Sequence, residues 1–194
     1  MISVGAPIET RVAPRKSRRI YITDTEINHL AHKLAHPTEI IIPTHFDTQL
    51  AKPLMRKRAI FHKIDGLHGH VHLHPHIRPK TVSNPPKVMV RRLLGDGIHD
   101  SDEILQIPEN WLEGLSIFTA DENEVTGNPW NLIQNVANMD GVITQSVTLA
   151  SEAVLLGVPT LLISKAKRGF LDRLKSDGYP LFVAKEKDES ILAE

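Results

Sequence analysis

Seven polar side chains in the second half of the sequence could bind a ligand that carries phosphate. Three are cations that would offset phosphate charge, and the others supply hydroxyl, amide or carboxylate groups for hydrogen bonds to phosphate or sugar. They are Arg91, Gln145, Ser146, Thr148, Glu152, Lys165 and Arg168. Each lies at or shortly after the end of a predicted strand, or on the helix that follows one.

The segment from residue 141 to residue 164 positions four of these side chains. It begins with a short β-branched run that is typical of a buried strand. Ser146 then breaks the apolar run as a helix N-cap, and apolar residues recur at helical spacing beyond it. Gly157 and Pro159 end the helix, and residues 160–163 start the next strand. Such a strand–helix–strand unit binds ligands at the turn between its first strand and its helix.

The start of this helix offers an anion site. Its first backbone amides have no partner within the helix, and the helix dipole favours negative charge there. Glu152, about a turn and a half further on, could accept hydrogen bonds from the hydroxyl groups of a ribose. The alternative is a capped helix that faces solvent, with Glu152 on its surface. The residues alone leave both interpretations open.

The remaining apolar runs predict an α/β fold with Rossmann-like, doubly wound parallel sheets. In the second half, predicted strands and helices alternate at 87–93, 115–119, from 128, 141–164, 170–175 and 181–183. The first half alternates in the same way, with predicted strands at 2–5, 20–22, 40–42 and 59–64. We therefore predict a partial amino-terminal domain at residues 1–80 and a carboxyl-terminal domain at residues 81–194.

One helix of the first half is predicted to be amphipathic. Its apolar residues Ile27, Leu30, Ala31 and Leu34 form one stripe. Its basic residues His29, His32, Lys33 and His36 lie on the opposite side. The spacing predicts a buried leucine face and a solvated histidine face.

The most unusual composition is in residues 67–79. Five histidines, at 68, 70, 72, 74 and 76, occupy every second position, so an extended chain would present all of them on one side. Neighbours two apart on a strand are roughly 6.6 Å from each other, which is too far for a compact metal shell without a turn. We expect no metal site here, and a histidine-rich metal-binding protein is kept as an alternative.

Overall composition excludes several classes of partner. Lysine plus arginine equals aspartate plus glutamate at 23 each, so no net field attracts nucleic acid. No apolar run approaches the roughly 20 residues that span a bilayer. The sequence has no cysteine, which fits a cytoplasmic protein.

The motif GVITQSVTLASEAVLLGVPTLLIS resembles the nucleotide-sugar motif in the carboxyl-terminal domain of GT-B glycosyltransferases and UDP-N-acetylglucosamine 2-epimerases. The chain is also similar to a longer, GT-B-like family of unknown function, through IYITDTEINH, HLHP, VMVRR and SEAVLLGVP. Against that family, the first strand–helix units of the amino-terminal domain are missing. Where such families have consecutive glycines, this chain has Gln145, Ser146 and Val147, whose side chains would obstruct a diphosphate.

The resemblance implies a nucleotide-sugar-binding protein, a glycosyltransferase-like or epimerase-like half-enzyme that a partner chain or a homo-oligomer would complete. The implied ligand is a UDP-sugar, with Glu152 as the ribose contact, and no metal or other cofactor. The alternative from a different class is a non-catalytic remnant, or an assembly module that self-associates through an exposed sheet edge.

Overall fold

The computed structural model describes residues 1–73, 81–93, 105–121 and 131–185. The chain is an α/β protein with a four-stranded and a five-stranded sheet, in which all paired strands are parallel. This confirms the predicted fold class.

The chain divides into two compact units. The first unit comprises residues 1–68 and 168–173, and the second comprises residues 69–167 and 174–194. The expected boundary between residues 80 and 81 adjoins residues 74–80, which lie outside the described part of the chain. The position of that boundary therefore stays a prediction.

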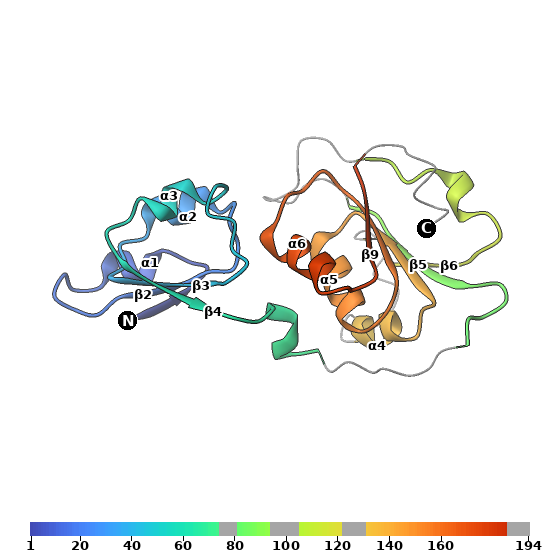
Figure 1. Ribbon diagram of the computed structural model, residues 1–194, viewed down its shortest axis with the longest axis horizontal. Coiled ribbons are helices and arrows are strands. Elements are labelled where there is room, and N and C mark those ends of the chain that lie inside the picture. The colour runs from blue at the N-terminus through green and yellow to red at the C-terminus, as the bar shows by residue number, and fades with distance from the viewer. Residues whose placement is uncertain (74–80, 94–104, 122–130, 186–194) are drawn as a thin grey trace. The chain divides into compact units, whose positions relative to one another are not determined.

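The first unit alternates strands and short helices, and its sheet keeps the strands in chain order, β1-β2-β3-β4. Figure 1 shows its three helices on one side of this sheet. Its elements are β1 (Ile2–Val4), α1 (Ile8–Val12), β2 (Ile20–Ile22), α2 (His29–Leu34), β3 (Glu39–Pro43), α3 (Lys52–Met55) and β4 (Ile60–Ile64).

The two faces of the first sheet have opposite environments. Tyr21 and Ile40 are paired in register and are fully buried beneath the helices. Val4, Ile60 and Ile64 point to the other face and are 71%, 64% and 58% exposed. Parallel sheets normally have both faces covered. The first unit therefore leaves one apolar sheet face open.

Helix α2 packs on a different face from the predicted one. Leu30 is 70% exposed, whereas His32 is fully buried, so the expected leucine stripe is wrong. The helix is only six residues long, and the small side chain of Ala31 lets it lie close to the sheet. The buried His32 ring meets Tyr21 edge-on, with the ring centroids 6.1 Å apart. The rotation of α2 about its own axis therefore follows its packing against Tyr21 and not the spacing of its apolar residues.

The second unit contains the five-stranded sheet with the order β6-β5-β7-β8-β9. The chain runs from β5 outward to β6, returns across β5 to β7, and then continues in the other direction, which is a doubly wound arrangement. Its elements are η1 (His68–Val71, which begins in the first unit), β5 (Lys87–Arg91), η2 (Glu109–Leu112), β6 (Ser116–Thr119), α4 (Leu132–Ala137), β7 (Gly141–Thr144), α5 (Val147–Leu155), β8 (Thr160–Ile163), α6 (Gly169–Ser176, whose first turn belongs to the first unit) and β9 (Leu181–Ala184).

Both faces of the central strands in this second sheet are buried. Val90 and Ile143 belong to a core cluster on one face that also includes Trp111. On the alternate positions, Met89 and Val142 are at most 1% exposed. This two-sided burial explains why the strands read as nearly continuous apolar runs.

The predicted strand–helix–strand unit is present as β7, α5 and β8. Gly157 adopts φ +79° just after α5, in the left-handed region that ends helices at low cost for glycine. Pro159 and β8 follow directly. Among the described residues, no helix has the length and apolar character to cross a membrane.

Candidate functional site

The carboxyl ends of β5 and β7 lie side by side at the point where the strand order of the second sheet reverses. Arg91 pairs in register with Thr144, and the Gln145 backbone amide donates to the Arg91 carbonyl at 3.2 Å. Ligands of open α/β sheets bind at such a reversal, outside the carboxyl ends of the strands. We call residues 91–93 together with 144–149 the switch-point edge.

Gln145 joins the two sides of this edge through its own side chain. Its Oε1 accepts a hydrogen bond from the Leu93 amide at 2.7 Å, and its Nε2 donates to the Leu105 carbonyl at 2.6 Å. The residue is only 6% exposed. Both ends of the side-chain amide are thus hydrogen-bonded to backbone groups. Gln145 therefore links Leu93 to Leu105, the residues on either side of residues 94–104.

Ser146 is the N-cap of α5, as predicted. Its Oγ accepts from the Leu149 amide at 3.3 Å, and its own amide donates to Thr144 Oγ1 at 2.9 Å. Thr148 lies in the first helical turn and is exposed. The first turn of α5 therefore presents a hydroxyl group to solvent beside the ends of two strands.

Glu152 forms an ion pair that the sequence pattern did not indicate. His72 Nε2 lies 3.3 Å from Glu152 Oε1, and the two side chains are 45% and 20% exposed. A ligand hydroxyl would therefore compete with an imidazole for this carboxylate. The pairing also gives one residue of the histidine-rich stretch a definite place in the second unit.

The cations at the end of β5 have different partners. Arg91 Nη1 donates to the Ala120 carbonyl at 3.2 Å. Arg92 is bound to two carboxylates, Asp121 at 3.4 Å and Glu109 at 3.3 Å. Arg92 is therefore largely neutralised within the protein, whereas the Arg91 guanidinium contacts a backbone carbonyl.

The two remaining predicted residues belong to different units. Lys165 is exposed after β8 in the second unit. Arg168 belongs to the first unit, and its burial lowers the pKa of its guanidinium from the ordinary value. The structure thus brings together Arg91, Gln145 and Ser146 within the second unit.

A second group of ionisable side chains, which the sequence reading missed, follows the strands of the first sheet. Glu26, just after β2, is fully buried; its Oε1 accepts from the amides of Asp47 at 3.2 Å and Gly169 at 3.0 Å. Glu26 Oε2 has no hydrogen-bond partner among the described residues. His45, just after β3, has a pKa that burial lowers. In the sequence, Glu26 and His45 could have been found from their positions shortly after predicted strands.

The histidine-rich stretch is not extended over residues 68–71. Residues 68–71 form a 3₁₀ turn, which points neighbouring histidines to different partners. His68 pairs with Asp24 at 3.2 Å, and His70 Nε2 lies 3.5 Å from the Tyr179 hydroxyl. Over the described ranges, no cluster of three or more metal-ligating side chains occurs, and residues 74 and 76 lie outside those ranges.

Comparison with known proteins identifies no family for the chain. No protein-family model, curated protein or solved structure matches it. The support for any function therefore comes from the geometry of the chain's own residues.

Proposed function

We propose that the second unit binds a nucleotide sugar of the UDP-sugar class at the switch-point edge. The observation that carries this proposal is the strand order, which sets the ends of β5 and β7 next to each other, with α5 beginning three residues after β7. This is the position at which doubly wound sheets bind phosphorylated ligands.

Polar residues of the edge and of the segments that follow it have separate roles in this proposal. Thr148 and the first backbone amides of α5 donate to the phosphates, and Arg91 and Lys165 offset their charge. Glu152 exchanges His72 for a ribose hydroxyl. Gln145 acts as a positioning residue, since its amide is already bound to backbone on both sides.

The reaction class that goes with such a ligand is glycosyl transfer or epimerisation of the sugar. An acceptor-side acid or base would then come from a partner chain or from a second copy, as the sequence resemblance implies. Binding is the part of the proposal that the described residues support, and it is tested first.

Titration calorimetry with UDP and UDP-N-acetylglucosamine tests the site. We expect Glu152→Ala to weaken nucleotide binding about tenfold, which corresponds to roughly 1.4 kcal/mol. The matched control is His72→Ala, which breaks the same ion pair but keeps the carboxylate. It should retain nucleotide binding or strengthen it, because the competing imidazole is gone.

Two results would contradict the proposal. The first is the absence of heat from either nucleotide at millimolar concentration with the wild-type protein. The second is an equal loss of affinity in Glu152→Ala and His72→Ala, because this would assign the effect to the ion pair rather than to a carboxylate that binds ribose.

A second candidate function, self-association, is favoured by the open apolar face of the first sheet. Ile2 and Val4 on β1 and Ile60 and Ile64 on β4 are all more than half exposed. Large apolar side chains that are exposed on one sheet face are typical of protein contacts. A second copy would cover the face through the same residues on both chains, as in a two-fold dimer.

Light scattering tests this second candidate. We expect a dimer that Ile60→Lys converts to monomer, because the substitution places a charge on the open face. Leu30→Lys is the control, since Leu30 is equally exposed on α2, on the helical side of the sheet. A monodisperse wild-type monomer at high concentration, or equal dissociation by both variants, would exclude this candidate.

A further inference from the structure

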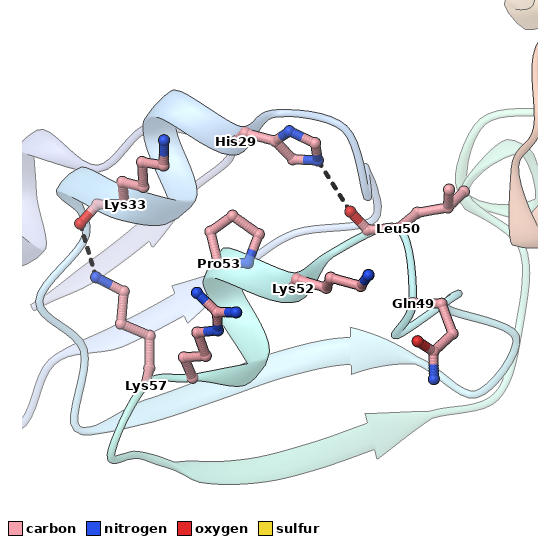
Figure 2. Close-up of a pocket in the computed structure, with 8 residues that line it drawn as sticks. His29, Lys33, Gln49, Leu50, Lys52, Pro53 and Lys57 are labelled. Atoms are coloured by element: carbon pink, nitrogen blue, oxygen red, sulfur yellow. Dashed lines mark hydrogen bonds between the residues drawn. The ribbon is translucent and has the colours of Figure 1, made fainter.

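The first unit has a pocket beside α2 and α3. Its volume is about 680 Å³, within the ~300–1,000 Å³ range of small-molecule sites. Figure 2 shows α2 with His29 and Lys33 on one side and the segment of Gln49, Leu50, Lys52 and Pro53 on the other. Its polar lining consists of six side chains: His29, Lys33, Gln49, Lys52, Arg56 and Lys57. We call these six residues the basic pocket.

The charge of the basic pocket has one sign. Four of its side chains are cations, and its lining contains no aspartate or glutamate. Across the described residues, no carboxylate forms an ion pair with Lys33, Lys52 or Arg56. Cations crowded in this way repel one another, and an anion between them removes the repulsion.

Two arginines elsewhere in the same unit have carboxylate partners. Arg18 binds Glu39 through two guanidinium nitrogens, and Arg173 binds Asp65 at 2.8 Å. Arg18 and Arg173 thus have carboxylates beside them, whereas the lining of the basic pocket contains none.

The frame of the pocket is already fixed by hydrogen bonds. Lys57 Nζ donates to the carbonyls of Lys33 and Ala35 at 2.7 and 2.8 Å, which ties it to the end of α2. His29 Nε2 lies 2.9 Å from the Leu50 carbonyl, across the pocket from α2 (Figure 2). A pocket whose walls are tied in this way loses little entropy when a ligand binds.

We propose that the basic pocket binds a small molecule that carries at least two phosphate groups. Phosphate oxygens are acceptors only, and lysine and arginine side chains are donors only, so lining and ligand are complementary. Several separate cations around a space of this volume suit linked phosphates better than one isolated phosphate. Lys52 and Arg56 are the expected phosphate contacts, and Lys57 holds the frame. This site is separate from the switch-point edge in residues and in unit.

Pyrophosphate is the probe, titrated by calorimetry at constant ionic strength. We expect Lys52→Gln with Arg56→Gln to weaken pyrophosphate binding at least tenfold. The matched control, Arg15→Gln with Lys16→Gln, removes the same charge from two exposed residues of the first unit outside the pocket. It should bind pyrophosphate within about twofold of the wild type. Orthophosphate should bind at least tenfold more weakly than pyrophosphate.

Three outcomes would overturn the proposal. In the first, the wild type does not bind pyrophosphate at millimolar concentration. In the second, the two double variants lose affinity equally, which shows a net-charge effect without a site. In the third, Arg91→Gln abolishes pyrophosphate binding while Lys52→Gln with Arg56→Gln keeps it, which moves the site to the second unit. All five substituted residues lie at the surface or half-buried, and a circular dichroism melt confirms folding.

Discussion

The switch-point edge and the basic pocket both contain several polar side chains, but the hydrogen-bond and ion-pair partners of those side chains differ. At the edge, Gln145 binds two backbone groups and Ser146 caps a helix. In the pocket, Lys52 and Arg56 have no carboxylate partner among the described residues. Gln145 and Ser146 therefore stabilise the fold first, whereas Lys52 and Arg56 are available for a ligand. Substitutions in the two regions should separate stability from binding.

The largest effect is expected at Gln145. Gln145→Met keeps the shape of the side chain but leaves the Leu93 amide and the Leu105 carbonyl without their partner, which should cost about 2–4 kcal/mol. The free energy of unfolding from urea titration measures this. Gln49→Met in the basic pocket is the control and should stay within about 0.5 kcal/mol, because Gln49 is exposed. An equal loss of unfolding free energy in Gln145→Met and Gln49→Met would show that the two regions do not differ in this way.

A pH effect of similar size is expected from α2, which carries one histidine in the pocket and one in the core. Burial lowers the pKa of His32 from 6.5 to about 4. The folded state therefore keeps His32 neutral, and the unfolded state binds its proton first as the pH falls. Stability should decline from about pH 6.5 to about pH 4, by on the order of 3 kcal/mol.

The measurement for His32 is the free energy of unfolding against pH, for the wild type and His32→Phe. The difference between the two curves isolates this histidine from other groups that titrate in the same range. A difference that stays constant between pH 7 and pH 4 would show that His32 is protonated alike in both states.

A smaller loss is expected for Lys57, the one cation of the basic pocket with a structural role. Lys57→Met removes two hydrogen bonds to the carbonyls of α2 and its C-cap and should cost about 1–2 kcal/mol. Lys52→Met should change stability by less than about 0.5 kcal/mol. Thermal unfolding of both variants measures the two losses of stability. The comparison tests whether Lys57 stabilises the pocket and Lys52 serves as a ligand contact. A larger loss from Lys52→Met would reverse that assignment.

The smallest effect is expected at the N-cap of α5. Ser146→Ala should cost about 1 kcal/mol because the Leu149 amide loses its acceptor, and Ser146→Asp should restore most of it. Hydrogen exchange at the Leu149 amide reports this directly. Unchanged protection of that amide in Ser146→Ala would mean that the cap contributes nothing.

The sequence predicts the strand–helix–strand unit of the second half well because its signals are local. A β-branched run, an N-cap serine and a glycine followed by a proline each act within a few residues, and the structure has β7, α5 and β8 at those positions. The alternation of strands and helices likewise predicts parallel sheets. These parts of the fold require no knowledge of distant contacts.

Long-range contacts are what the sequence could not indicate. The partner of Glu152 is His72, which lies 80 positions earlier in the chain. The rotation of α2 depends on Tyr21, which is in another element, so apolar spacing within the helix misplaced Leu30 and His32. The basic pocket combines His29 and Lys33 with residues 49–57. Taken alone, the polar residues of each segment are typical of a solvated surface.

One titration compares the two regions within a single experiment. Amide ¹H–¹⁵N spectra of the wild-type protein, recorded as UDP-N-acetylglucosamine is added, report on every part of the chain at once. The proposed function predicts saturable shifts at the Leu93 amide and at the amides of residues 146–149, in the first turn of α5. Shifts confined to α2 and residues 49–57, or no shifts at millimolar nucleotide sugar, would contradict the assignment of the ligand to the switch-point edge.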